Sequence, residues 1–405
     1  MTGLTDIKLD LLQTLSLAGL VYFGGIRLRK RLAWLDRLNI PAAVVGGLVF
    51  TTLVLLLRHW SVTIQLDTSM QATLSVAFFT SIGMGASLAL LRRGGLQVLV
   101  FLVLATLFCL VQNFVGIAIA SGFGENPLLG VMAGSVTLVG GPATGLAFAP
   151  VFEQAGLKGA GPLALTAATA GIVCGGLVGG PVGTYLIRRF GLASTTRSAE
   201  EVKAELDASP ETLIVEVDRE DSAFVRNLVV LGLAMGIGSI VSGYIQSLGV
   251  TLPAYIGAML IASGLRNIDD VSGWLRIDQR TMEFVGNLAL NVFLVVALMN
   301  LKLWELAGLA LPLVVILVAQ VIIVVLFSLT VAFRTMGKDY ESAVMASGFI
   351  GFVLGTTANA VANMRALVAR FGAAPRAFLI VPLVGAFFID FTNAIIITFF
   401  VNWLK

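Results

Sequence analysis

The two halves of this 405-residue chain repeat one sequence pattern about 213 positions apart. Residues 40–47 are echoed by residues 252–258 at an offset of 212, and residues 131–134 by residues 344–347 at an offset of 213. Phe79 and Phe293, which begin two further related segments, are 214 positions apart. Because three separate places agree on nearly one offset, we interpret the chain as two copies of one unit joined in a single polypeptide.

The composition places both copies in a membrane. Hydrophobic residues make up 58% of the chain and charged residues 12%, whereas a soluble domain carries about 25% charged residues. A membrane-spanning helix needs about 20 apolar residues, and such segments are found at residues 9–27, 40–57, 72–91, 96–121, 160–187, 225–247, 251–265, 283–301, 306–333 and 377–403. We therefore expect an all-α polytopic membrane protein, and a membrane unit present twice is typical of a secondary transporter.

The distribution of Lys and Arg predicts the orientation, because cytoplasmic loops collect basic residues. With the N-terminus outside and five crossings in each half, 21 of the 26 basic residues lie on the cytoplasmic side. Five is an odd number, so the second copy enters the membrane the other way up and the repeats are inverted. Both termini are then outside. The net charge of +3 follows from this retention signal and does not indicate nucleic-acid binding.

Three regions follow from this reading. Residues 1–190 form the first membrane repeat and residues 225–405 the second. Between them, residues 191–224 are hydrophilic and hold nine of the 23 acidic residues. We interpret this stretch as a cytoplasmic linker.

Two apolar stretches in matching places of the copies, 134–145 and 347–359, contain too many Gly, Pro and polar residues for plain spanning helices. Non-helical backbone at membrane depth is tolerated only where it is buried in protein or lines a watery cavity, and paired broken segments indicate a binding site. The alternative is that the small residues only allow close helix packing. We predict cargo-binding roles for Ser135, Thr137, Gly140, Gly141, Thr144, Gly355, Thr356, Thr357 and Asn359.

Polar residues inside the other spans suggest a cation site. Asp390 lies near the middle of the last span, where an ionisable residue is a functional hypothesis. It is a candidate sodium ligand together with Asn393, Asn287, Asn291 and Asn363. Proton carriage by Asp390, a structural pairing with Arg365, and simple hydrogen bonding between helices by the amides are the alternatives. Arg365 is also a candidate for binding a cargo carboxylate, although cytoplasmic retention accounts for its presence equally well.

Enzyme chemistry has no visible basis in the sequence. Zinc-ligand spacing, a phosphate-binding loop, a nucleophile triad and a nucleotide fingerprint are all missing. We therefore expect neither an enzyme nor an organic cofactor.

These residues together resemble the bacterial glutamate:sodium symporter family over nearly the whole chain. The resemblance rests on residues 40–47, 134–145, 297–306, 360–364 and 384–390. It implies two inverted five-helix domains with re-entrant loops at about 126–150 and 340–364, and a cytoplasmic central loop. It further implies sodium-coupled glutamate uptake across the bacterial inner membrane, with Na⁺ as the coupling ion. A homodimer embedded in membrane lipid, whose transport domain moves against a scaffold, is also expected.

The resemblance is imperfect in both broken stretches, and the second is altered around residues 349–350 and 357–359. Pro142 and Ala143 stand where the family usually carries a His-Gly pair after the two glycines. This departure keeps a proton- or sodium-coupled carrier of another small organic anion as an alternative, and an ion channel is the rival from a different class.

Overall fold

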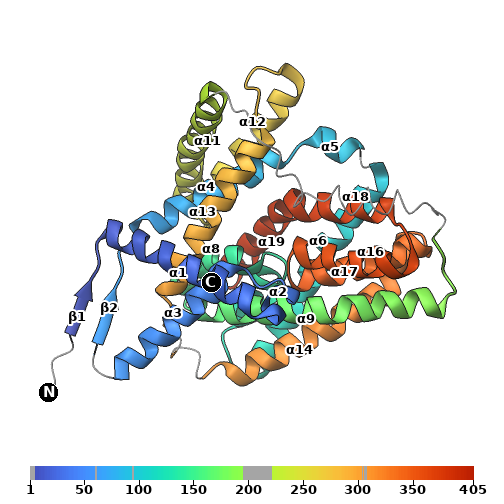
Figure 1. Ribbon diagram of the computed structural model, residues 1–405, viewed down its shortest axis with the longest axis horizontal. Coiled ribbons are helices and arrows are strands. Elements are labelled where there is room, and N and C mark those ends of the chain that lie inside the picture. The colour runs from blue at the N-terminus through green and yellow to red at the C-terminus, as the bar shows by residue number, and fades with distance from the viewer. Residues whose placement is uncertain (1–4, 60–61, 94, 195–220, 303, 305–307) are drawn as a thin grey trace.

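The fold is almost entirely helical (Figure 1). The computed structural model describes residues 5–59, 62–93, 95–194, 221–302, 304 and 308–405. Within these residues seven helices are long and apolar enough to cross a membrane, as expected for a polytopic membrane protein. The one sheet found there pairs β1 (Thr5–Lys8) with β2 (Val62–Gln65) in parallel, with Thr5 opposite Val62. The predicted linker lies largely in residues 195–220, outside the described part of the chain.

The helices follow the order of the apolar segments. In the first half they are α1 (Leu11–Arg31), α2 (Ala33–Arg37), α3 (Ala42–His59), α4 (Ser69–Gly85), α5 (Leu88–Arg93), α6 (Gly95–Gly122), α7 (Pro127–Val131), the wide π-type turn η1 (Met132–Val136), α8 (Gly141–Gln154) and α9 (Ala160–Arg189). In the second half they are α11 (Asp221–Ser247), α12 (Tyr255–Ser272), α13 (Gln279–Met299), α14 (Ala310–Phe327), η4 (Ser328–Ala332), α15 (Phe333–Thr335), α16 (Tyr340–Leu354), α17 (Thr357–Phe371), α18 (Pro375–Leu383), η5 (Val384–Phe388) and α19 (Ile389–Trp403).

The segment expected at 72–91 is interrupted. Helix α4 ends at Gly85, and α5 begins only at Leu88. Asn267 of α12 bonds both sides of the gap: its Nδ2 donates to the carbonyl of Ala86 at 2.9 Å, and its Oδ1 accepts from the Leu88 N–H at 2.8 Å. A partner 181 residues away thus supplies the bonds that the interrupted helix lacks, which no local pattern predicts.

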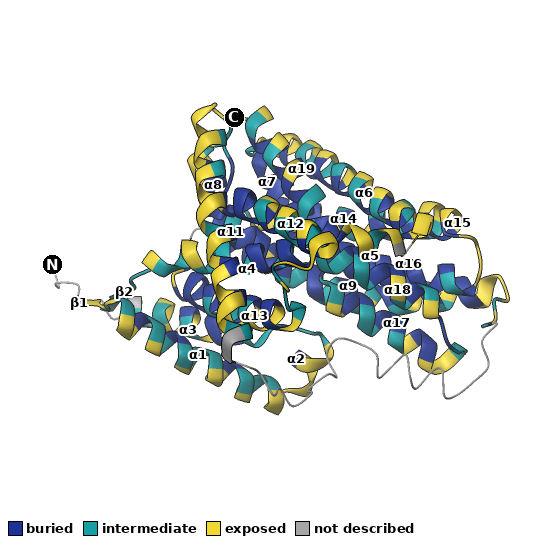
Figure 2. Ribbon diagram, turned by 90° about the horizontal axis from the view of Figure 1, so that it is seen from above, coloured by how far each residue is buried: buried dark blue, intermediate teal, exposed yellow. Residues whose placement is uncertain are grey.

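The helices form two groups that meet along a limited interface. We call α1, α3, α4, α11, α12 and α13 the scaffold group, because each packs mainly on others of this set. We call α6 to α9, α14 and α16 to α19 the core group, which contains the largest cluster of buried hydrophobic side chains. The groups lie at opposite ends of the molecule in Figure 1, and the core group is the more deeply buried in Figure 2.

Small residues allow the two groups to approach. Gly85 of α4 faces Phe387 of η5 so closely that a Cβ atom at Gly85 would lie 2.0 Å from the ring. Helix α8 belongs to the core group by sequence neighbours but also packs on α4 and α13. The interface therefore runs past α8, the segment that follows the first broken stretch.

Candidate functional site

The first broken stretch is a real interruption of the helix between η1 and α8. Gly134 has φ −101° and ψ −129°, which is not helical, and Gly141 has φ +66°, a conformation that favours glycine. The freed N–H of Ser135 donates to Asn113 Oδ1 of α6 at 2.9 Å, and Thr137 Oγ1 donates to the carbonyl of Met132 at 2.7 Å. Side chains and neighbouring carbonyls thus replace the lost helical bonds.

The second broken stretch separates α16 from α17. Gly355 has φ −144° and ψ −100°, and Thr356 then caps α17, because its Oγ1 accepts from the N–H of Asn359 at 3.4 Å. Thr357, at the first position of α17, is half-buried. Like the first stretch, this one starts a new helix with unpaired N–H groups at its N-terminus.

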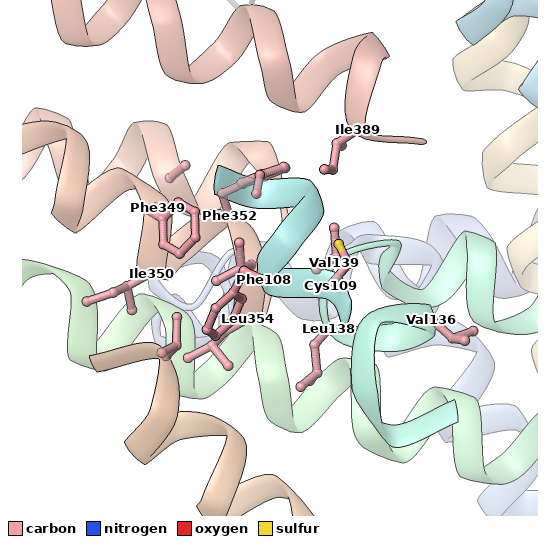
Figure 3. Close-up of a cluster of buried hydrophobic side chains, with 14 of the residues drawn as sticks. Phe108, Cys109, Val136, Leu138, Val139, Phe349, Ile350, Phe352, Leu354 and Ile389 are labelled. Atoms are coloured by element: carbon pink, nitrogen blue, oxygen red, sulfur yellow. The ribbon is translucent and has the colours of Figure 1, made fainter. Parts of the chain in front are cut away.

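The two interruptions meet although they are more than 200 residues apart in the chain. A Cβ atom at Gly141 would lie 3.8 Å from the carbonyl oxygen of Gly355 and from Cγ2 of Thr356. Gly171 of α9 contacts both stretches, since its Cβ would lie 2.2 Å from the Leu354 oxygen and 2.6 Å from Leu138 Cδ2. Figure 3 shows Leu138 and Val139 of the first stretch and Leu354 of the second in one hydrophobic cluster with Phe108 and Cys109 of α6.

Two helix N-termini come together at this meeting point. Helices α8 and α17 both begin there, and a helix N-terminus carries a partial positive charge with N–H donors aimed outward. The predicted cargo residues that the structure brings together at this point are Gly140, Gly141, Thr144, Gly355, Thr356 and Thr357. Arg365 is not one of them, because it lies eight residues beyond the start of α17, about 12 Å along the helix.

Three buried asparagines tie neighbouring helices to the broken stretches. Asn359 Nδ2 donates to the carbonyl of Ile172 at 2.7 Å, and Asn363 Nδ2 to that of Gly175 at 2.9 Å. Asn393 Nδ2 of α19 donates to the carbonyl of Ser135 at 2.9 Å. Each amide has used a donor on a backbone carbonyl, so hydrogen bonding between helices accounts for part of their role.

Oxygen atoms near these bonds are left without partners among the described residues. They are Asn393 Oδ1, Asn359 Oδ1 and the hydroxyl of Ser135. A buried polar atom without a partner costs free energy and calls for an explanation such as an ion or water. Neutral oxygens in a protein interior are what a monovalent cation requires, and unwound segments of transporters supply them.

Asp390 stands one helical turn before Asn393 on α19. Its carboxylate has neither a hydrogen bond nor an ion pair within the part of the chain that the structure describes. The pairing with Arg365 that the sequence left open is thus not formed. Helix α19 packs on α6, α7 and η1, so Asp390 belongs to the same helix set as the first broken stretch.

Asn287 and Asn291 lie elsewhere. Both are on α13, which packs mainly on α3 and α4 of the scaffold group, and Asn291 Nδ2 donates to the Asn287 carbonyl within the same helix at 2.8 Å. Asn287 is exposed. The structure therefore does not bring these two amides to Asp390.

Tyr255 is a candidate that sequence reasoning missed. Its ring stacks on Phe79 with 3.8 Å between centroids and meets Phe148 of α8 edge-to-face at 5.8 Å. The side chain is buried, and its hydroxyl has no partner among the described residues. A signal was present, because the matching position of the first copy is Ala43.

Two adjoining cavities lie between the scaffold group and α8. Their volumes are about 720 and 620 Å³, and Gln71, Leu146 and Pro150 line both. Lys405 lines the larger cavity, and Lys158 and Lys302 the smaller. The charge distribution predicts these three residues to be outside, together with Lys8 and Arg58. Both cavities therefore lie toward the predicted outer face.

A cluster of charged residues links the start of α16, the helix before the second broken stretch, to the start of α18. Arg376 Nη2 lies 2.6 Å from both carboxylate oxygens of Asp339, and Glu341 accepts from the N–H of Ala377 at 3.1 Å. The start of α18 is thereby fixed to the start of α16. Burial opposes ionisation of Asp339, but hydrogen bonds from Ser342 and Arg376 together hold the pKa of this carboxyl below its ordinary value of 3.8.

We expect Arg376→Gln to lower the thermal midpoint of the purified protein at pH 7 modestly, since a partly exposed pair contributes about 0.2–1 kcal/mol. A depressed folded pKa means that the stabilisation is present above pH 3.8 and is lost as the pH falls through the lower folded value. The difference between wild type and variant should therefore shrink below pH 3.8. Thermal melts across pH measure it, with Arg29→Gln as control for an exposed pair; a pH-independent difference would contradict the assignment.

Comparison with known proteins identifies the family of this chain. The family model described as sodium/glutamate symporter matches residues 7–373. The sodium/glutamate symporter of Escherichia coli (strain K12) is 39% identical over 393 residues, 96% of each chain. That of Haemophilus influenzae is 37% identical over 385 residues, 94% of this chain and 95% of the relative. A solved sodium proton antiporter, MjNhaP1 from Methanocaldococcus jannaschii, is 15% identical with a TM-score of 0.46 over 98% of each chain.

The family model and the two symporter relatives show that the chain belongs to the sodium/glutamate symporter family.

Proposed function

We propose that this protein is a sodium-coupled symporter of glutamate in the bacterial inner membrane. The observation that carries the proposal is the meeting of two broken helices, at Gly141 and Gly355, within one buried helix group. We assign the cargo anion to the helix N-termini that meet there, and Na⁺ to Asp390 with the unpartnered oxygens of Asn393 and Ser135. The curated relatives that bear the name sodium/glutamate symporter support the choice of cargo and ion.

The residues divide into two roles. The N-termini of α8 and α17 and the hydroxyls of Thr144, Thr356 and Thr357 hold the cargo carboxylates. Asp390, Asn393 and the Ser135 hydroxyl hold Na⁺, whose charge offsets that of the cargo. Asn359 and Asn363 position α17 against α9 through their bonds to Ile172 and Gly175. Na⁺ and glutamate stabilise each other in this arrangement, which couples their transport.

We also propose the topology that the sequence predicts. The chain would comprise two inverted repeats of five crossings, 1–190 and 225–405, with re-entrant loops at about 126–150 and 340–364 and a cytoplasmic linker. The core group would move against the scaffold group as in an elevator, and the scaffold would form a homodimer. The limited interface between the groups and the two cavities beside α8 support this division. Alternating access then requires the cargo to bind the two orientations with different free energies.

Uptake into proteoliposomes tests the function. The purified protein should accumulate labelled glutamate under an inward Na⁺ gradient, and replacing Na⁺ by K⁺ should abolish the accumulation. Uptake driven equally well by a proton gradient in K⁺ would contradict sodium coupling. Counterflow of labelled glutamate against unlabelled internal glutamate separates the carrier from a channel, because a channel produces no counterflow.

A second candidate cargo is another small organic anion. Pro142 and Ala143 begin α8 at the anion site, in the place where the family usually carries a His-Gly pair. Neither side chain offers a hydrogen-bond donor, so the site at this end of α8 recognises less of the cargo. Competition of a panel of amino and dicarboxylic acids against labelled glutamate distinguishes the two cargoes, and stronger inhibition by a compound other than glutamate would favour the alternative.

Tyr255→Phe tests whether the buried hydroxyl takes part in binding. Phenylalanine keeps both ring contacts and removes a hydroxyl whose burial without a partner costs about 1–3 kcal/mol. We expect unchanged or higher thermal stability together with about ten-fold weaker half-saturation by sodium or glutamate. Tyr244→Phe, on an exposed face of α11, is the matched control. Unchanged half-saturation in both titrations would assign Tyr255 to packing alone.

A further inference from the structure

A third cavity lies between the last turns of α9 and α17. Its volume is about 740 Å³. Three arginines, Arg188, Arg189 and Arg370, form one end of it. No carboxylate lines it among the described residues, and none of these arginines has an ion pair there. The cavity thus concentrates positive charge that no carboxylate of the described residues neutralises.

The residues along this groove change from small or apolar to basic toward the C-terminal ends of α9 and α17. On α9, one stripe of residues four apart runs Gly176, Gly180, Thr184 and Arg188, and the neighbouring stripe runs Leu177, Pro181, Tyr185 and Arg189. On α17 the stripe is Ala362, Ala366 and Arg370. Residues four apart share a helix face, so each of the three stripes passes from small or apolar residues to an arginine.

The apolar part of the groove is open. A Cβ atom at Gly176 or at Gly180 would meet no atom within 4 Å, and Leu177 and Tyr185 are more than half exposed. The cavity begins at Gly180, and the face of α9 from Gly176 to Arg188 extends about 18 Å. Asn363 and Leu367, packed on Gly179 and Gly183, close the adjoining side where α17 touches α9.

We propose that this groove binds an anionic phospholipid, with its phosphate on the three arginines and an acyl chain along the glycine and alanine stripes. A soluble anion would use the arginines but not the open apolar face, whereas a phospholipid has the same polarity as the groove. Basic pockets between membrane helices on the cytoplasmic side are suited to such headgroups. Tyr185, between the apolar and basic parts, lies where aromatic side chains meet the membrane interface. The proposal goes beyond transport and does not depend on the cargo.

Thermal stabilisation of the full-length protein in detergent tests this site. Added dioleoyl phosphatidylglycerol should raise the thermal midpoint saturably, whereas dioleoyl phosphatidylcholine and glycerol 1-phosphate should not. Each arginine near an anionic headgroup is worth about five-fold in affinity. The triple variant with Arg188→Gln, Arg189→Gln and Arg370→Gln should therefore lose about 100-fold. Arg334→Gln, an exposed basic residue outside the cavity, is the matched control and should bind as the wild type does.

A second variant examines the groove without changing its charge. Ala366→Trp fills the space beside Arg370 at an exposed position, so it should fold normally and lose phosphatidylglycerol binding. Equal stabilisation by phosphatidylcholine would show that no headgroup is selected, and equal stabilisation by glycerol 1-phosphate would show a site for free anions. Either result, or unaltered binding by Ala366→Trp, would overturn the lipid site.

Discussion

Asp390→Asn should leave a folded protein that no longer accumulates glutamate at ordinary sodium concentrations. The carboxylate is placed among helices of the core group without a hydrogen bond or ion pair from the described residues, so its charge has to be offset by a proton or, in the proposed ion site, by a bound Na⁺. Removing one partner of a buried charge pair costs about 3–5 kcal/mol, which corresponds to more than about 100-fold in affinity. We therefore expect half-saturation by Na⁺ to rise by at least about 100-fold.

Uptake of labelled glutamate into proteoliposomes across a range of Na⁺ concentrations measures this effect. Asp390→Glu keeps the charge and should retain part of the sodium response. Asp36→Asn, which removes an exposed carboxylate paired with Arg29 at 2.7 Å, should behave as the wild type does. Unchanged sodium half-saturation in Asp390→Asn would remove this residue from the ion site.

Gly171→Ala should strongly reduce glutamate transport although it adds only one methyl group. That methyl would lie 2.2 Å from the Leu354 oxygen and 2.6 Å from Leu138 Cδ2, so α9 would have to move away from both broken stretches at once. Overpacking of a close contact costs about 1–3 kcal/mol, and here the displacement would separate the two interrupted stretches that we propose as the anion site. We expect a loss of glutamate uptake of about ten-fold or more.

Gly176→Ala is the matched control, because it makes the same substitution on the same helix where a Cβ atom meets nothing within 4 Å. Alanine is also the better helix former, so this variant should transport normally and melt no earlier than wild type. Membrane expression of both variants, followed by initial uptake rates, makes the comparison. Normal transport by Gly171→Ala would show that the meeting of the two stretches is not needed for cargo binding.

The sequence identified the candidate residues whose signal is local, and it misjudged those whose position depends on contacts between distant helices. Gly141 and Gly355 were found because Gly and Pro interrupt helical hydrogen bonding, a property of the residues themselves. Asn291 was grouped with Asp390 only because both are polar and lie in apolar spans, and its helix turned out to pack on α3 and α4. Tyr255 escaped notice because a tyrosine in an apolar span is unremarkable until its hydroxyl is seen to be buried without a partner.

Hydrophobicity, the internal repeat and the positions of Lys and Arg were enough to predict a helical membrane protein with ten apolar segments and two interrupted ones. Those properties follow from short-range rules, since a backbone in lipid must satisfy its hydrogen bonds within the segment. The sequence does not show which helix faces contact one another. The contact of Gly171 with both interruptions, and the bond from Asn393 to the carbonyl of Ser135, 258 positions away, depend on close packing between distant segments. Close packing is a property of whole surfaces, so these contacts became visible only in the folded chain.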